Sequence, residues 1–183
     1  MPEFASPEAQ ELWKHAEQLK SEGRREEALQ TLARLREREP QNPAVPNRMG
    51  VTLVELGRRS EAEDHFCAAV GCDPHYAPAI TNVGNIRYEE GRYQEAVAKY
   101  NEALAVDPSY ANAHNNLAAA LRRLGQYGAA VRSLKRAHAL QRGGWDRQSR
   151  AEARETFRKV RGKWGCLIAA VIVLVVIVYA LTR

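Results

Sequence analysis

The chain has 183 residues, a formal net charge of +5 and three cysteines, a length that suits one domain with accessory segments. The positive charge is local, because residues 142–163 hold eight basic and three acidic residues, whereas residues 1–141 hold 18 basic and 19 acidic residues. A nearly neutral body lacks the basic stripe of a nucleic-acid-binding surface, so we expect no nucleic-acid partner.

Residues 9–142 repeat with a period of 34, in units of 9–42, 43–76, 77–110 and 111–142 that follow a lead-in at 1–8. Three kinds of residue recur in register: a glycine (Gly23, Gly57, Gly91, Gly125), an alanine (Ala28, Ala62, Ala96, Ala130) and, in three units, a proline (Pro40, Pro74, Pro108). This period and pattern resemble the tetratricopeptide repeat family, whose unit is a helix–turn–helix. The resemblance implies an all-α fold, a right-handed superhelical solenoid of paired helices.

Within the first unit, Ser6-Pro7 predicts a helix start with serine as the N-cap and proline in the first helical position. We expect this helix to run to about Glu22, to turn at Gly23, and to be followed by a second helix from about Glu26 to Glu39. The turn glycine can adopt a positive φ without a Cβ penalty.

A small residue at the eighth position of each unit (Ala16, Gly50, Gly84, Ala118) predicts a close crossing of the two helices, since a large side chain there would separate the backbones. Larger apolar residues are expected to fill the remaining core: Leu12, Leu19, Leu32, Met49, Leu53, Phe66, Ile80, Val83, Tyr100, Leu117, Leu121 and Leu134.

The array is expected to end at Arg142-Gly143-Gly144, which replaces the proline-terminated end of the earlier units. The stretch from Ser149 to Glu152 then fits a capping box that opens another helix. Residues 143–163 are therefore predicted to form a basic helix that caps the last repeat or lies along a membrane surface.

Residues 164–182 contain no charged side chain. A helix of this length spans about 28 Å, close to the hydrocarbon thickness of a bilayer, so a single C-terminal transmembrane helix, a tail anchor, is predicted. Five basic residues precede it (Arg154, Arg158, Lys159, Arg161, Lys163) and one follows it (Arg183). The positive-inside rule then places the array in the cytoplasm, at the bacterial inner membrane or, in a eukaryote, at the mitochondrial outer membrane or endoplasmic reticulum.

The family resemblance also implies a concave groove lined by the first helix of each unit. Carried over to this sequence, the candidate binding residues are Asn47, Arg48, Asn82, Asn85, Tyr88, Asn112, Asn115, Asn116, Arg122 and Arg123. Asparagine is a poor former of helix interiors, so its clustering on one face needs a reason. A side-chain amide both donates and accepts hydrogen bonds, which suits the backbone of an extended peptide. An ordinary solvated face is the alternative explanation.

A two-lysine, arginine-containing clamp for a C-terminal carboxylate occurs in some family members. Neither possible frame keeps its basic residues: one offers Trp13, Glu17, Arg48, Pro78 and Asn82, and the other offers Asn47, Val51, Asn82, Asn112 and Asn116. We therefore do not expect recognition of a chaperone tail.

No metal or other cofactor is expected. His65, Cys67, Cys72 and His75 match no common zinc spacing, so buried thiols and surface histidines are the better interpretation. No pattern of an active site is present, so we expect a protein that is not an enzyme.

The sequence thus predicts a membrane-tethered adaptor that binds a protein or an extended peptide in its groove on the cytosolic face of a membrane. The alternative is a self-associating scaffold, a homo-oligomer, or an assembly factor for a membrane complex.

Overall fold

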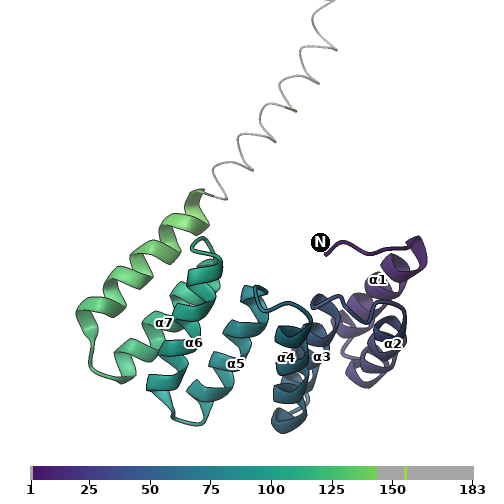
Figure 1. Ribbon diagram of the computed structural model, residues 1–183, viewed down its shortest axis with the longest axis horizontal. Helices are drawn as coiled ribbons and strands as arrows, with labels where there is room; N and C mark the ends of the chain where they lie inside the picture. The colour runs from purple at the N-terminus through teal and green to yellow at the C-terminus, as the bar shows by residue number, and fades with distance from the viewer. Residues whose placement is uncertain (1, 144–154, 156–183) are drawn as a thin grey trace, which may run out of the picture. The chain divides into compact units, whose positions relative to one another are not determined.

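The computed structural model of the chain describes residues 2–143 and 155. Seven helices follow one another in the order α1 (Pro7–Ser21), α2 (Arg25–Arg38), α3 (Ala44–Glu55), α4 (Arg59–Cys72), α5 (Ala77–Glu89), α6 (Tyr93–Val106) and α7 (Ala111–Arg123) (Figure 1). A further helix covers residues 127–143. No strand occurs within this described part of the chain. The chain divides into two compact units, Met1–His138 and Ala139–Arg183, and the first of them holds the repeats.

The helix ends lie where the sequence predicts them, within about two residues. Ser6 is the N-cap of α1: its Oγ accepts a hydrogen bond from the Ala9 N–H at 3.1 Å, and Pro7 occupies the first turn. Each pair is joined by a glycine with a φ between 73° and 80° (Gly23, Gly57, Gly91, Gly125). A positive φ of this size is cheap for glycine alone, which explains the invariant turn residue of the four units.

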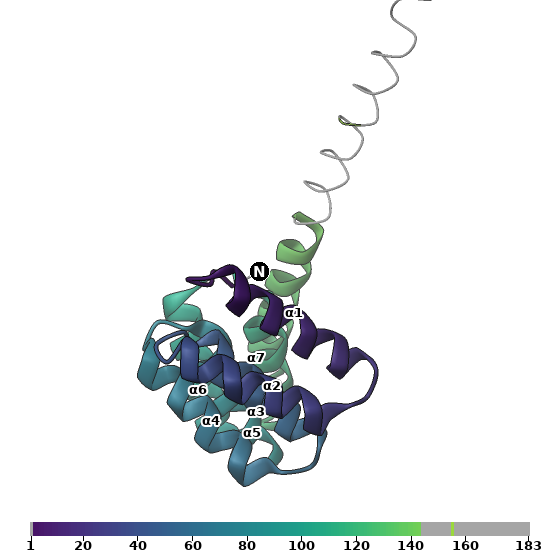
Figure 2. The same ribbon diagram turned by 90° about the vertical axis from the view of Figure 1, so that its right-hand side faces the viewer.

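Helices α1 and α2, α3 and α4, and α5 and α6 pack as pairs, and each pair contacts the next (Figures 1 and 2). The predicted close crossing is present in the second and third pairs. A Cβ atom added to Gly50 would lie 2.5 Å from the Phe66 ring, and one added to Gly84 would lie 2.7 Å from the Tyr100 ring. Glycine is therefore required at both positions, because the space of a side chain is already filled by an aromatic ring.

We call α1, α3, α5 and α7 the first helices and α2, α4, α6 and 127–143 the second helices. Among the labelled helices, α3 contacts α5 and α5 contacts α7, whereas α2, α4 and α6 do not contact one another to that extent. In a curved stack, the elements on the inner side lie closer together. Helices α3, α5 and α7 therefore form the inner, concave face of the array, as the family resemblance implied.

The predicted core is confirmed for most of its members, including Phe66 and Tyr100, which are 2% and 1% exposed. Leu134 was expected in the core and this prediction is wrong, because its side chain is 42% exposed. Leu12 is only partly buried. The prediction of buried thiols is also wrong for Cys67, which is exposed on α4, while Cys72 is half-buried.

The predicted membrane span 164–182 and nearly all of the basic segment 143–163 lie outside the described residues. None of the helices within 2–143 is long and apolar enough to cross a membrane.

Candidate functional site

Four of the predicted binding residues form one row of hydrogen-bonded amides across three first helices. We call Asn47, Asn82, Asn85 and Asn116 the asparagine ladder. The Nδ2 of Asn82 donates to Oδ1 of Asn47 at 2.8 Å, and Nδ2 of Asn85 donates to Oδ1 of Asn82 at 3.2 Å. The row continues to α7, where Nδ2 of Asn116 donates to Oδ1 of Asn85 at 2.8 Å. The sequence clustering of asparagine thus corresponds to a physical network on the concave face.

A hydrogen bond from Tyr100 anchors the asparagine ladder. The sequence analysis assigned this tyrosine only to the hydrophobic core. Tyr100 on α6 is 1% exposed, and its hydroxyl donates to Oδ1 of Asn85 at 2.9 Å. Burial raises the pKa of the Tyr100 phenol, so the hydroxyl keeps its proton at neutral pH and remains a donor. Asn85 therefore accepts from both Asn116 and Tyr100 and is the best anchored amide of the row.

The ladder leaves hydrogen-bonding capacity unused. Asn82, Asn85 and Asn116 each place one of their two amide N–H groups in the ladder. Their second N–H groups, both N–H groups of Asn47 and the Oδ1 of Asn116 have no partner among the described residues. The half-buried row therefore presents oriented donors and an acceptor along the concave face, which is the complement of a peptide backbone.

A cavity of about 210 Å³ opens beside the ladder and is lined by Asn85, Tyr88, Glu89, Tyr100, Asn116 and Ala119. Tyr88 packs edge-on against Tyr93, with 5.3 Å between the ring centroids. The cavity combines an aromatic wall with amide groups, so it can take an apolar side chain next to a hydrogen-bonded backbone.

The predicted arginines of the groove differ in how their charges are balanced. Arg48 is paired with Glu17, with Nε and Oε1 2.9 Å apart, and its guanidinium lies 5.3 Å from the centre of the Trp13 ring. Arg123 donates from Nη2 to the Tyr93 hydroxyl at 2.7 Å and lies 5.1 Å from the centre of that ring. Its partner is a hydroxyl and not a carboxylate, so no acidic side chain compensates the Arg123 charge, whereas the Arg48 charge is compensated by Glu17.

The contact of Arg123 belongs to a link between neighbouring repeats that recurs at a separation of 30 residues. Arg25 Nε meets Glu55 Oε2 at 3.0 Å, and Arg59 Nε meets Glu89 Oε2 at 2.8 Å. In the third link, Tyr93 replaces the arginine and Arg123 replaces the glutamate. The carboxylate of the earlier links has thus become a cation at the α7 end of the concave face.

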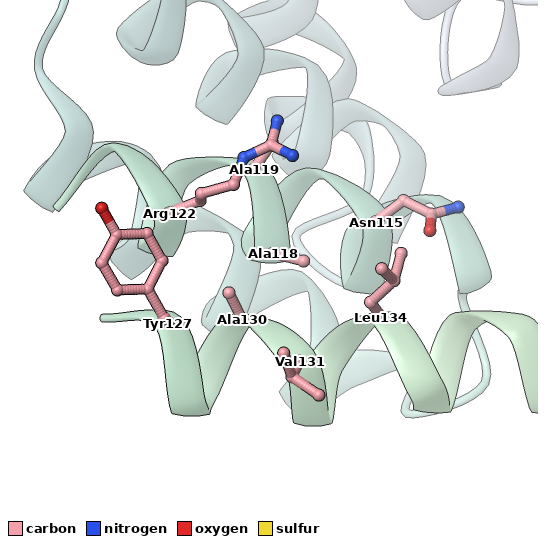
Figure 3. A pocket seen from close by; sticks show the side chains of 8 residues that line it. All are labelled: Asn115, Ala118, Ala119, Arg122, Tyr127, Ala130, Val131 and Leu134. Atoms are coloured by element: carbon pink, nitrogen blue, oxygen red, sulfur yellow. The ribbon is translucent and has the colours of Figure 1, made fainter. Parts of the chain in front are cut away.

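The remaining predicted residues stand apart from the ladder. Asn115 and Arg122 line a different groove, between α7 and the helix 127–143 (Figure 3). Asn112 is exposed in the first turn of α7. Tyr93 and Tyr100 are the site residues that sequence reasoning missed. The signal for Tyr93 was an aromatic residue where two earlier units place an arginine (Arg25, Arg59).

Within residues 2–143 and 155, no group of three or more histidine, cysteine, aspartate or glutamate side chains is placed to hold a metal ion. His65 and Cys67 do not converge with Cys72 and His75: Arg36 contacts the His65 ring at 3.4 Å, and the Cys72 thiol donates to the Pro40 carbonyl at 3.5 Å. Burial, followed by the Arg36 charge, lowers the pKa of His65.

Comparison with protein families agrees with the architecture. Tetratricopeptide repeat models match residues 14–77 and 113–144, and a model described as TPR repeat matches residues 84–125. No relative is found among curated proteins.

Solved structures share the fold. A crystal structure of MamA covers 75% of this chain and 81% of its own, at 17% identity and a TM-score of 0.63. MamA from Desulfovibrio magneticus RS-1, residues 41 to the end, covers 75% and 77%, at 22% identity and a TM-score of 0.61.

A third structure, the first TPR domain of Spaghetti (RPAP3) bound to the HSP90 peptide SRMEEVD, covers 64% of this chain and 93% of its own, at 23% identity and a TM-score of 0.58. At these identities the likeness concerns the fold. The helix pairs, the turn glycines and the matched segments together show tetratricopeptide repeats over residues 14–77 and 84–144.

Proposed function

We propose that the protein is an adaptor that binds an extended segment of a partner protein in the concave groove formed by α3, α5 and α7. The asparagine ladder is the observation that carries this proposal. Four amides held in one row by their own hydrogen bonds lose little conformational freedom when a ligand binds, so their unused donors and acceptor can contribute to affinity at low entropic cost. The peptide-bound structure of the similar TPR domain supports peptide binding as a use of this fold.

The charges of the groove favour a partner with an acidic group near α7. Arg123 has no carboxylate partner among the described residues, whereas Arg48 at the other side of the groove is paired with Glu17. A carboxylate of the partner would form charge-assisted hydrogen bonds with an unpaired guanidinium. The two-lysine clamp is missing, so we do not assign the HSP90 peptide as the ligand.

We further propose that residues 164–182 tether the array to a membrane and that the basic residues before them keep the array on the cytosolic side. This part rests on the sequence alone: an uncharged stretch long enough to span a bilayer, with five basic residues before it and one after it. Tethering raises the effective concentration of the array near membrane partners, so a modest affinity of the groove suffices.

The test of groove binding is capture of partners by the full chain, compared with the triple variant Asn82→Ala, Asn85→Ala, Asn116→Ala. Alanine has a higher helix propensity than asparagine, so the variant helices should form at least as readily. We expect the partners bound by the original chain to be lost. The matched control is Asn101→Ala, an exposed asparagine on α6, which should leave capture unchanged. Undiminished capture by the triple variant would contradict the groove proposal.

The tether has its own test, because it can fail while groove binding holds. Deletion of residues 164–183 should move the protein from the membrane fraction to the soluble fraction. Persistent membrane association of the shortened protein would indicate that the basic segment, and not the apolar stretch, holds it there.

The second candidate function, a self-associating scaffold, predicts a different result in the same experiments. A scaffold would sediment as an oligomer, both as the original chain and as the triple variant, whereas an adaptor would sediment as a single copy and would lose its partner in the variant. Sedimentation of the two proteins in detergent separates these cases.

A further inference from the structure

The fourth repeat ends in an apolar groove that lies outside the asparagine ladder. We call it the end groove. It has a volume of about 350 Å³ and lies between α7 and the helix 127–143, where it is lined by Asn115, Ala118, Ala119, Arg122, Tyr127, Ala130, Val131 and Leu134 (Figure 3). Its three large apolar residues are exposed: Tyr127 by 66%, Val131 by 51% and Leu134 by 42%.

The repeat register shows what kind of element this groove is shaped to receive. Counting back 34 residues, Tyr127, Ala130, Val131 and Leu134 correspond to Tyr93, Ala96, Val97 and Tyr100. In the third repeat, Ala96 and Tyr100 are buried and form one hydrophobic cluster with residues of α7, and Val97 packs against that cluster. The end groove is therefore the same surface one repeat later, the surface on which the next first helix would pack.

The complementary helix can be described from the way α7 fills the equivalent surface. Residues Ala113, Leu117, Ala120 and Leu121 of α7 are buried, and the last three belong to the cluster with Ala96 and Tyr100. They follow the spacing i, i+4, i+7 and i+8, which places them on one face of a helix. A ligand of the end groove is thus expected to be an amphipathic helix with small and large apolar residues at this spacing.

The charge around the groove narrows the choice of partner further. Residues 111–138 contain five basic residues (Arg122, Arg123, Arg132, Lys135, Arg136) and no aspartate or glutamate. Arg122 lines the groove, and Lys135 lies one turn after Val131 on the same helix. Carboxylates along the edges of an incoming helix would therefore be attracted, whereas a basic helix would be repelled.

Two other occupants, the segment that follows the fourth repeat and a second copy of the chain, match this surface less well. The sequence of residues 142–163 is basic, with eight basic and three acidic residues, so its charge has the same sign as the groove rim. A second copy could add its α1 as the next first helix, but α1 has exposed polar residues (Glu11, His15, Gln18) where α7 has Ala113, Leu117 and Ala120. The repeat register would therefore place polar side chains against the apolar floor.

We propose that the end groove binds an acidic amphipathic helix of a partner protein, which packs on the fourth repeat as α7 packs on the third. This site is separate from the asparagine ladder, so it adds a second binding surface to the proposed adaptor, and its test does not depend on ligand binding in the concave groove.

The experiment measures binding of a fluorescent synthetic helix by the full chain in detergent micelles. The probe is a peptide of about 18 residues, long enough for measurable helicity. It carries Ala, Leu, Ala and Leu at the spacing of Ala113, Leu117, Ala120 and Leu121, and glutamate at its outward positions. One control peptide has the same composition in scrambled order, and a second has lysine in place of glutamate. We expect a Kd in the micromolar range for the probe and at least roughly tenfold weaker binding of either control.

Variants of the protein locate the binding surface. The double substitution Val131→Ser, Leu134→Ser should weaken probe binding by about tenfold or more, since both side chains are exposed and apolar. Arg122→Glu should weaken binding of the glutamate peptide and strengthen that of the lysine peptide. Lys14→Glu makes the same change of charge on α1, where Lys14 is exposed, and should change neither. Because Val131 and Leu134 are not part of the buried core, circular dichroism should show an unchanged fold.

Three results would overturn the proposal. The first is failure of the full chain to bind the probe. The second is equal binding of the probe and the scrambled peptide, or unchanged binding by the Val131→Ser, Leu134→Ser protein. The third is a self-associated protein that this double variant converts to a monomer, because the groove would then be occupied by a second copy and not by a partner helix.

Discussion

The third and fourth repeats place similar residues at equivalent positions in two different environments. Tyr100 in the third repeat is 1% exposed, whereas Leu134, its counterpart 34 residues later, is 42% exposed. The difference comes from α7, which covers the third repeat, while no labelled helix covers the fourth. Burial of an apolar residue in such an array is therefore decided by the following repeat as much as by its own, as expected for a fold in which each unit contacts only its neighbours.

The first repeat shows that the opposite end of the array is finished differently. On α1, exposed polar residues (Glu11, His15, Gln18) take the positions that are apolar and buried on α7. Phe4 of the lead-in packs against Trp13, with 5.3 Å between the ring centroids, and Asn42 donates to the Glu3 carbonyl at 2.9 Å. The N-terminal end is thus covered by polar side chains and by the lead-in, whereas the fourth repeat exposes an apolar surface on which another helix could pack.

The largest expected effect is a difference in the free energy of unfolding between substitutions at the equivalent positions Tyr100 and Leu134. Tyr100→Ala should lower the free energy of unfolding by about 3–5 kcal/mol, because it removes a buried aromatic side chain and leaves a cavity. Leu134→Ala should cost less than about 1 kcal/mol, since much of that side chain is already in solvent. Urea denaturation of the full chain in detergent, followed by helical circular dichroism, measures both values. Equal losses would mean that the fourth repeat is covered as completely as the third.

The next prediction concerns the close crossing in the third repeat. Gly84→Ala should destabilise the array by about 1–3 kcal/mol, because the added Cβ would lie 2.7 Å from the Tyr100 ring. Gly71→Ala on α4 is the control, since no atom lies within 4 Å of the added Cβ. That substitution should stabilise by about 0.5–1 kcal/mol through helix propensity. Thermal unfolding should show a lower stability for Gly84→Ala and a higher stability for Gly71→Ala, which would support the close crossing. An unchanged stability of Gly84→Ala would contradict it.

A smaller effect tests the hydrogen bond that supports the ladder. Tyr100→Phe keeps the buried ring but removes the donor to Asn85, so it should cost about 1 kcal/mol. Tyr127→Phe makes the same change on an exposed tyrosine of the fourth repeat and should stay within about 0.5 kcal/mol of the original protein. Denaturant midpoints of the two variants give the comparison. Equal denaturant midpoints for the two variants would mean that the hydrogen bond from Tyr100 does not stabilise the ladder.

The smallest effect contrasts the link between the first two repeats with its counterpart at α7. Burial opposes ionisation of Glu55, but hydrogen bonds from Lys20 and Arg25 outweigh it and lower the pKa of this carboxyl. A lowered pKa in the folded state gives stability that is present above the unfolded value of about 4.3 and is lost as the pH falls through the folded value.

Glu55→Gln should therefore cost about 0.5–1 kcal/mol at pH 7, and the difference should disappear as the pH falls well below 4.3. Arg123→Gln removes the corresponding link at α7, where the partner is the Tyr93 hydroxyl. Its cost should not change with pH in this range, because this link contains no carboxylate. Unfolding titrations between about pH 3 and 7 test the contrast, and a pH-independent effect of Glu55→Gln would contradict the assignment.

The sequence was sufficient to predict the repeat, its helix pairs and its turns, because these depend on local rules that every unit repeats. The N-cap at Ser6, the positive φ of the turn glycines and the close approach at Gly84 each follow from one residue type at one position. The exposure of Leu134 could not be predicted in this way, because it depends on whether another helix follows.

The candidate site was predicted in part. The asparagines were found by their positions, but the sequence could not show that four of them are hydrogen-bonded to one another while Asn115 faces a separate groove. Nor could it show that Arg48 is neutralised by Glu17, because that pair joins residues 31 positions apart in different repeats. Such pairings depend on the superhelical stacking, which spacing alone does not determine.

The most direct test of partner binding in the concave groove is site-specific photo-crosslinking of the full chain in living cells. A photoreactive phenylalanine derivative would replace Glu89, which lines the cavity beside the ladder, or Glu26, an exposed residue of α2, as the control. We predict a crosslinked partner from position 89 that is absent from position 26 and is lost when Asn82, Asn85 and Asn116 are changed to alanine. A partner that crosslinks from position 26 but not from position 89 would contradict binding in the groove.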